Sequence, residues 1–291
     1  MVRMWLLGLW ALTALVAMPA IAQDRAEVLR KAEIGMVVTG FVEIEPDGSV
    51  SSHEITGRGE LPDYVVAMVD EAAATWRFEP VEQDGVPVRA RTQMSLRLVA
   101  QALGEGEEFV VRIDNGSFGG YDPEDTGRVV AKRMTPPQYP LEMLTRMAEG
   151  TVYLLVKVGR DGRVQDLAVE RVNLGQYAAE GEMEQRRRAL ARSVEKTARR
   201  WVFRPPTTGP YVDRDWWVTR VPVEFEIDTP RRPRAGQWMA YIPGPALPVP
   251  EWGAHSSGSD AALAGVAQML ESEVKLLSPL HTPHYRPDSR R

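Results

Sequence analysis

Residues 150–169 read GTVYLLVKVGRDGRVQDLAV, and this stretch decides the fold that we expect. Alternate residues from Val152 to Val158 are apolar, which is the period of a strand with one buried face. Asp-Gly at 161–162 then separates two such runs, and this dipeptide favours a hairpin because both central residues of the turn need positive φ. Residues 163–172 are therefore expected to return as the second strand of a β-hairpin.

A helix and a closing strand are expected downstream of this hairpin. Apolar residues between Leu190 and Trp201 recur at spacings of four, four and three, which indicates a helix over about 183–201. The helix should end at the sequence Trp-Val-Phe-Arg-Pro-Pro, because proline cannot continue it. In the last strand, 217–227, alternate residues face the core, and the others, including Pro222 in mid-strand, face the opposite way.

Basic residues dominate the remaining surface of this helix. Two interpretations stay open for them: a solvated helix face, or a basic docking surface. The residues are Arg186, Arg187, Arg188, Arg192, Lys196, Arg199 and Arg200.

The same order of signals occurs earlier in the chain in a shorter form. Asp-Gly at 47–48 follows an alternating run, and a helical stripe from Val65 to Trp76 ends in a second Trp-x-Phe-x-Pro sequence. An alternating strand at 88–98 closes the unit. The order strand, Asp-Gly turn, strand, helix, Trp-x-Phe-x-Pro and strand therefore occurs twice, which predicts a tandem repeat.

The predicted fold class is α+β, with two units that each form a small antiparallel sheet of about three strands with one or two helices on one face. The expected segments are a signal peptide (1–22), a first unit (34–100), a linker (101–135), a second unit (136–228) and a Pro-rich, partly disordered tail (229–291). Within the linker, 109–113 is a candidate extra strand. Within the tail, apolar residues at helical spacing indicate a short helix over 259–277.

The first residues predict export from the cytoplasm. An apolar run from Trp5 to Met18 precedes small residues at Ala20 and Ala22, which fit a signal-peptide cleavage site before Gln23. We therefore expect cleavage after Ala22 and a periplasmic protein. The alternative is an inner-membrane anchor, because the run nearly reaches the roughly 20 residues that a spanning helix needs.

Composition narrows the function classes. The 291-residue chain is 44% hydrophobic and 26% charged, which is typical of a globular protein. A formal net charge of −5 argues against nucleic acid as the main partner. The chain has no cysteine, no phosphate loop and no nucleophile elbow, and its paired histidines, His281 and His284, lie in the Pro-rich tail. We therefore predict no catalytic residue, metal, cofactor or small-molecule substrate, and expect that the protein is not an enzyme.

The second unit resembles the carboxy-terminal domain of TonB-type energy transducers. The resemblance rests on Pro-Gln-Tyr-Pro at 137–140, a short helix at 141–148, the Asp-Gly turn, the Trp-x-Phe-x-Pro sequence and the closing strand. The first unit carries the turn and the Trp-x-Phe-x-Pro sequence alone, and resembles a diverged copy. The structural motif residues of the two units are Asp47, Gly48, Trp76, Phe78, Pro80, Tyr139, Pro140, Gly150, Asp161, Gly162, Trp201, Phe203 and Pro205.

The resemblance implies a periplasmic domain that takes a short segment of a TonB-dependent outer-membrane receptor as an added strand. Pro222 also favours a sheet edge, because proline cannot donate to a β-ladder, and an open edge is a template for another strand. Two alternatives remain for this edge: the chain's own tail covers it, or a second copy pairs with it. The expected partner-binding residues are Pro137, Gln138, Tyr139, Trp216, Arg220, Pro222 and Glu224.

Three functional hypotheses follow. The first is a periplasmic protein-binding module that contacts an outer-membrane receptor or another envelope protein by β-strand addition. The second is a membrane-anchored energy transducer for outer-membrane transport. The apolar run 5–18 has no histidine, whereas full transducers carry polar residues there, so the first hypothesis ranks above it. The third is a structural envelope protein that self-associates as a homodimer.

Overall fold

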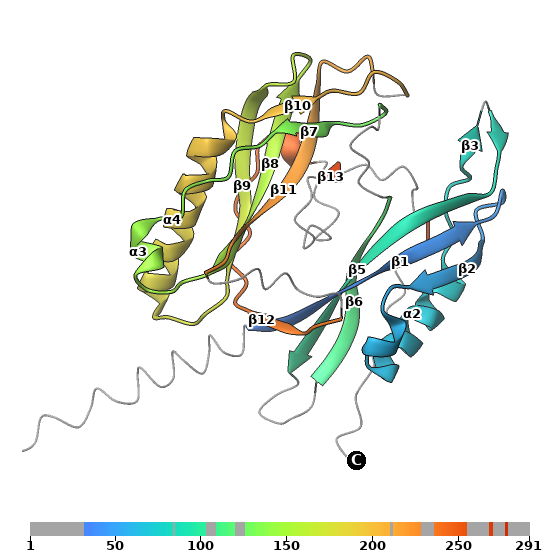
Figure 1. Ribbon diagram of the computed structural model, residues 1–291, viewed down its shortest axis with the longest axis horizontal. Helices are drawn as coiled ribbons and strands as arrows, with labels where there is room; N and C mark the ends of the chain where they lie inside the picture. The colour runs from blue at the N-terminus through green and yellow to red at the C-terminus, as the bar shows by residue number, and fades with distance from the viewer. Residues whose placement is uncertain are drawn as a thin grey trace, which may run out of the picture.

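The computed structural model describes residues 32–83, 85–102, 109–119, 126–209, 212–227, 236–254, 268–269 and 277–278. Figure 1 shows two β-sheets, each with its helices on the outer side. The strand pairs are antiparallel, so the predicted α+β class is confirmed. The expected signal peptide, 1–22, lies outside the described residues. Among the helices that the structure describes, none is long and apolar enough to cross a membrane.

The first sheet is built around one long strand, β1, which pairs with β5 from Ile34 to Ile44. Its order is β12-β1-β5-β6, and β2 pairs with the far end of β1 from β12. Trp76 and Phe78 follow the helix of this unit and are fully buried under it. The elements are β1 (Glu33–Ile44), β2 (Val50–Ile55), η1 (Arg58–Glu60), α2 (Asp63–Thr75), β3 (Glu82–Gln83), β4 (Val86–Pro87), β5 (Ala90–Ala102) and β6 (Phe109–Phe118).

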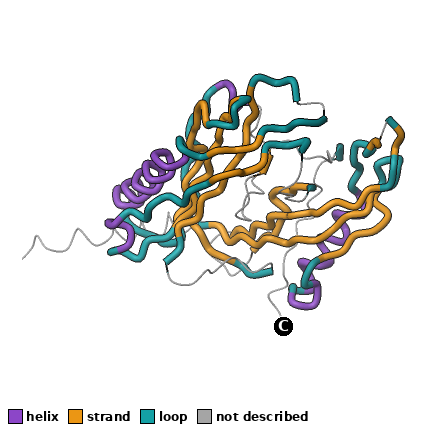
Figure 2. The backbone as a smooth tube through the Cα atoms, turned by 45° about the horizontal axis from the view of Figure 1, so that its top comes forward, coloured by secondary structure: helices purple, strands orange, loops and turns teal. Residues whose placement is uncertain are grey.

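The second sheet has three long strands and one short one, in the order β13-β11-β8-β9. A separate two-stranded sheet, β7 with β10, lies beside it (Figure 1). Figure 2 shows the strands of the sheets in orange, with helices in purple along their outer sides. Leu190, Val194 and Ala198 of α4 are buried against the long strands, as the helical stripe predicts. The elements are β7 (Val130–Arg133), α3 (Leu141–Leu144), β8 (Gly150–Gly159), β9 (Val164–Leu174), α4 (Glu180–Ala198), β10 (Val202–Arg204), β11 (Trp216–Phe225), β12 (Met239–Tyr241), α5 (Glu251–Ala254) and β13 (Gln268–Met269).

The segment predicted as a linker contributes two strands. β6 has ten residues, where the candidate strand had five, and β7 lies at the far end of the same segment. Val111 and Ile113 are buried in the first core, so this stretch completes the sheet. Its Gly-, Asp- and Glu-rich composition concealed the strand, because few of its residues supply the buried face.

The tail also departs from expectation. Residues 236–254 form an extended segment, here called the strap, that includes β12 and α5. The helix predicted over 259–277 is wrong where the structure describes it, because Gln268–Met269 form β13. β13 pairs with β11, so strand pairing replaces the helical pattern there.

The Asp-Gly hairpin docks on the end of the helix in the same way in both units. The amide of Phe203 donates to the carbonyl of Gly162 at 2.8 Å, and the amide of Phe78 donates to the carbonyl of Gly48 at 2.8 Å. Both glycines have positive φ, 74° and 80°. A Cβ on either would lie under 3.0 Å from the carbonyl oxygen of its phenylalanine partner. The turn therefore needs glycine for close approach as well as for its dihedral angle.

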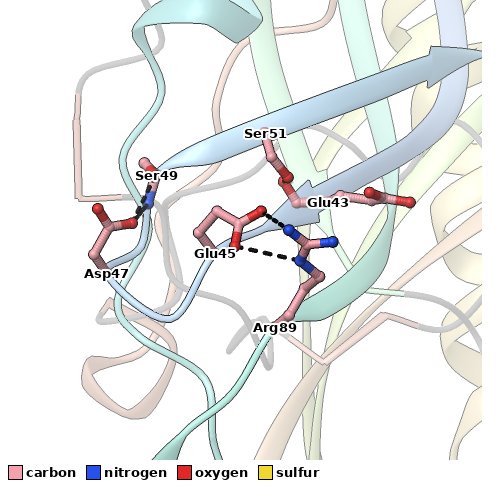
Figure 3. A network of polar contacts seen from close by, with 6 residues as sticks. All are labelled: Glu43, Glu45, Asp47, Ser49, Ser51 and Arg89. Carbon is pink, nitrogen blue, oxygen red and sulfur yellow. Dashed lines mark hydrogen bonds and ion pairs between the residues drawn. The ribbon is translucent and has the colours of Figure 1, made fainter.

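Figure 3 shows the polar contacts around the first of these turns. The Asp47 carboxylate accepts hydrogen bonds from the amide and the hydroxyl of Ser49, at 2.9 and 2.6 Å. Glu45 accepts from Arg89 at 2.5 and 3.3 Å, which ties the hairpin to the chain that leads into β5. The Asp47–Ser49 contacts are local and fix the turn, whereas the Glu45–Arg89 pair holds the turn against the start of β5.

Asp70 on α2 is expected to make the first unit sensitive to acid. Its carboxylate accepts from Arg58 at 2.9 and 2.6 Å and contacts His53 of β2 at 2.7 Å. Hydrogen bonding from Arg58 lowers the pKa of Asp70 below its usual value of 3.8. Because the folded-state pKa is the lower one, the stabilisation is present above the unfolded pKa and is lost as pH falls through the folded pKa.

The measurement compares thermal unfolding of the wild type and Asp70→Asn from pH 7 to pH 2. We expect Asp70→Asn to be less stable at pH 7 by about 1 kcal/mol or less, because solvent screens so exposed a pair. The two unfolding temperatures should converge below pH 4. A difference that stays constant down to pH 2 would contradict this account.

Candidate functional site

β11 is the strand that sequence reasoning selected as the binding edge. It pairs with β8 over all ten of its residues, from Trp216 opposite Gly159 to Phe225 opposite Gly150. On its other side it pairs with β13 at Thr219 and Arg220. The neighbour on that side is therefore only two residues long, so β11 lies next to the edge of the sheet.

Pro222 indicates which backbone groups of β11 face this side. It pairs with Tyr153 of β8 in a ladder without a bulge on β11. Proline is tolerated in a strand where its nitrogen faces away from the neighbouring strand. We infer that the even-numbered residues, such as Val218 and Glu224, direct their N–H and C=O groups toward the β13 side.

Arg220 and Pro222, two of the expected partner-binding residues, are buried on the side of β11 that faces away from α4. Arg220 is 2% exposed. The guanidinium of Arg220 donates to both oxygens of Glu170 on β9, at 2.8 and 2.7 Å. Both faces of the sheet are covered here, because Leu155 of β8, which faces away from α4, is also fully buried. The side chain of Arg220 therefore links β11 to β9 inside the protein.

Trp216 is the exposed aromatic residue of the candidate edge. It is 37% exposed, at the start of β11. The ammonium of Lys157 lies 4.4 Å from its ring centroid, a cation–π contact across the β8–β11 pair. Glu224, near the other end of the strand, is partly buried.

The segment Pro137–Tyr139 lies at the opposite end of β11 from Trp216. The carbonyl of Gln138 accepts from the hydroxyl of Ser193 on α4, and the Gln138 side chain is exposed. Pro137 is partly buried beside it. At about 3.3 Å per residue, the ends of β11 are roughly 30 Å apart. The predicted contacts therefore mark two ends of a long edge, and do not form one compact site.

Tyr139 has a structural position within this segment. Its hydroxyl donates to the carbonyl of Ala148 at 2.7 Å, and its ring meets the edge of Phe225 with centroids 5.3 Å apart. Burial raises the pKa of Tyr139 to about 12, so the hydroxyl stays a donor at neutral pH. It anchors the segment 137–140 over the end of β11.

The other motif residues lie in the cores or at turns. Trp201 is 2% exposed, and its indole N–H donates to the carbonyl of Thr135 at 2.9 Å. A Cβ on Gly150 would lie 2.6 Å from the carbonyl oxygen of Asn173, which explains a glycine at the start of β8. Pro140 precedes α3 as its N-cap. Within the described ranges, no three His, Asp or Glu side chains group to hold a metal ion.

Sequence reasoning missed the strap. β12 adds to the edge of β1, and Ile242 forms a two-way bridge with Leu174 of β9, at 2.7 and 3.0 Å. The side chain of Ile242 is buried in the second core, while Trp238 packs against the first. Further along, the amide of Leu247 donates to the carbonyl of Glu170 at 2.9 Å. The strap therefore supplies backbone partners to one edge of each sheet.

The strap also meets a buried charge. Arg97 of β5 is 3% exposed, and its guanidinium contacts the hydroxyl of Tyr241 and lies 3.6 Å from the Glu33 carboxylate. Burial raises the pKa of Tyr241, so its hydroxyl remains neutral and donates to Glu33. The aromatic residues in an otherwise Pro-rich stretch were the available signal for this packing.

The similarity of this chain to known proteins is low. No family model matches the chain, and no curated protein matches it. A solution structure of the TonB CTD from Pseudomonas aeruginosa matches with 25% sequence identity. It covers 35% of this chain and 90% of that domain, with a TM-score of 0.25. At this TM-score, the likeness does not establish a common fold.

Proposed function

We propose that this protein is a protein-binding module of the bacterial envelope, which takes an extended segment of another protein along β11. Its setting would be the periplasm, and its partner a TonB-dependent outer-membrane receptor or another envelope protein. Main-chain hydrogen bonds would supply the affinity, and the side chains at the two ends of the strand, Trp216 and Gln138, would supply specificity. No catalytic step belongs to this function.

One observation carries the proposal: β11 already accepts an added strand from a distant part of the chain. Gln268–Met269 pair with it antiparallel, at Arg220 and Thr219. The β11 backbone thus has the geometry for strand addition. Because β13 has two residues and β11 has ten, a partner segment could offer a longer ladder than the tail does.

The edges at β1 and β9 support the choice of β11. β12 pairs with one end of β1, and β2 with the other. On β9, Ile242 and Leu247 of the strap bond Leu174 and Glu170. A partner strand on β1 or β9 would have to displace a segment whose side chains enter the cores, which opposes binding there.

Site-specific photo-cross-linking in growing cells tests the proposal. A benzophenone amino acid would replace Trp216 or Val218 on β11, and Gln185 on the exposed side of α4 would serve as the control position. We expect both β11 positions to cross-link to one short segment of one envelope protein, and Gln185 not to. Cross-links from β11 to this chain alone would instead support the self-associating structural protein.

Removing residues 255–291 is expected to strengthen binding at β11. The deletion removes β13 and keeps the strap, so the partner no longer competes with two paired residues. Loss of about two backbone hydrogen bonds should raise affinity roughly tenfold. Titration with the cross-linked partner segment, as a synthetic peptide, measures the change.

Gln268→Pro is the matched control for the deletion. Gln268 lies opposite Arg220, whose backbone faces β13, so proline at this position removes one strand donor and keeps the rest of the tail. It should therefore give part of the same gain. Equal affinity of the deletion, Gln268→Pro and the wild type would show that the tail does not compete for β11.

A further inference from the structure

The basic residues of α4 divide into two groups. Toward the start of the helix, Arg186 and Arg188 pair with Glu182 and Glu184, each at 2.8 Å. Arg187 is buried, 8% exposed, and its nearest carboxylate is Glu180 at 3.7 Å. These cations are ion-paired or buried, so they leave little net charge at the start of the helix.

The second half of α4 carries cations of another kind. We call this half, together with the two residues after it and its neighbours on β7, the basic end. All six of its cations are exposed, and among the described residues none has a carboxylate within ion-pair distance. The helix macrodipole favours positive charge in the last turn, but it does not account for cations further back or on another strand. The residues are Lys132, Arg133, Arg192, Lys196, Arg199 and Arg200.

Their spacing places these charges together. Arg192, Lys196 and Arg199 are four and three residues apart, so they form one ridge on the outer side of the helix. Arg133 pairs with Val202, two residues after Arg200, which brings β7 beside the end of α4. One acidic residue, Glu195, lies in this half of the helix. The basic end is thus strongly positive on a chain whose net charge is −5.

An apolar cluster lies on the same outer layer. Leu141, Leu144 and Met147, in and just after α3, are 78%, 39% and 56% exposed. Arg146 pairs with Glu182 and so ties α3 to the first half of α4. Figure 1 shows α3 beside α4, on the outer side of the second sheet. With about 1.5 Å of rise per residue, the apolar cluster and the basic end are roughly 20 Å apart.

We propose that this outer face of α3 and α4 binds the surface of an anionic phospholipid bilayer. The arginines of the basic end would hold headgroup phosphates through paired N–H donors. The three apolar side chains would enter the boundary between headgroups and acyl chains. A flat lipid surface can meet both features at once, across 20 Å or so.

Two other partners fit less well. A nucleic acid would leave the apolar cluster without a partner, and the rest of this acidic chain would repel it. An acidic peptide would match the charge of the basic end but would leave the apolar cluster, at the other end of the layer, without a partner. This inference does not depend on the role proposed for β11, because the β11 edge is not part of this face.

The test is sedimentation of the full chain with vesicles at about 50 mM salt, where screening is weak. The vesicles are pure phosphatidylcholine, or phosphatidylcholine with about 30% phosphatidylglycerol. One variant combines R192Q, K196Q, R199Q and R200Q. The matched control combines R58Q, R77Q, R89Q and R91Q, four exposed cations of the first unit, and changes the net charge equally. Circular dichroism confirms that each variant is folded.

We expect the wild type and the control to bind the anionic vesicles more tightly than the neutral ones, and the α4 variant to lose at least about 50-fold of that difference. Substituting serine for Leu141, Leu144 and Met147 together should weaken binding to anionic vesicles. The salt dependence of that binding should stay unchanged. Equal loss in the α4 variant and the control, or equal binding to both vesicles, would overturn the proposal. So would binding of poly-glutamate through the basic end without vesicle binding, which would assign the face to an acidic protein partner.

Discussion

Replacing Gly162 by alanine is expected to unfold or severely destabilise the second unit. The residue has φ of 74°, where a side chain costs about 1 kcal/mol. Its new Cβ would also lie under 3.0 Å from the carbonyl oxygen of Phe203, a backbone atom that the buried Phe203 ring holds in place. Relieving this overlap means separating the hairpin from the helix end, at a further cost of about 1–3 kcal/mol. We therefore expect a total loss of about 3 kcal/mol in free energy of unfolding.

Gly209→Ala is the control that isolates the close approach. Gly209 has φ of 84°, yet among the described residues its Cβ would have no neighbour nearer than 3.9 Å. It should lose only the conformational part, about 1 kcal/mol. Urea unfolding monitored by tryptophan fluorescence measures both variants. Equal losses for Gly162→Ala and Gly209→Ala would mean that the contact with Phe203 does not hold the hairpin.

Glu170→Ala is expected to destabilise the protein by about 3 kcal/mol, because it removes the carboxylate that two nitrogens of the buried Arg220 guanidinium bond. Arg220 is 2% exposed and bonds Glu170 through two nitrogens. The partial exposure of Glu170, 20%, places the expected loss at the lower end of the range for buried pairs.

A second substitution separates loss of charge balance from loss of packing. Adding Arg220→Met to Glu170→Ala removes the buried positive charge and keeps an apolar stem, so the double variant should regain more than half of the loss. Chemical unfolding of the two single variants and the double variant gives the coupling between the residues. If the losses simply add, the two side chains are not a structural pair, and the account of their contact would be contradicted.

The repeated order of elements was predictable because its signals are local. Period-two runs, the Asp-Gly turns and the Trp-x-Phe-x-Pro helix ends each specify a structure within a few residues. Trp76 and Trp201 end their helical stripes in the buried cores, where that spacing would place them. The hairpins at 47–48 and 161–162 lie where Asp-Gly stands in the sequence.

The candidate site was less predictable, because its features depend on distant segments. Alternation predicted that Arg220 faces away from the core, but no local pattern reveals that this face is covered as well. The strap pairs residues near 240 with β1 and β9, and β13 reaches back to β11 across 48 positions, from Arg220 to Gln268. Short extended pieces of this kind have too few residues to show a period.

Backbone amide hydrogen exchange tests the central claim, addition of a strand to β11, most directly. Exchange would be measured by NMR in the free protein and in the protein saturated with the segment identified by cross-linking. We predict that the amides of Trp216 and Val218, which face the outer side of β11, exchange more slowly by about tenfold or more. Val221 and Val223, which bond β8, should change little. Unchanged exchange along β11, with protection appearing over α3 and α4 instead, would contradict strand addition at this edge.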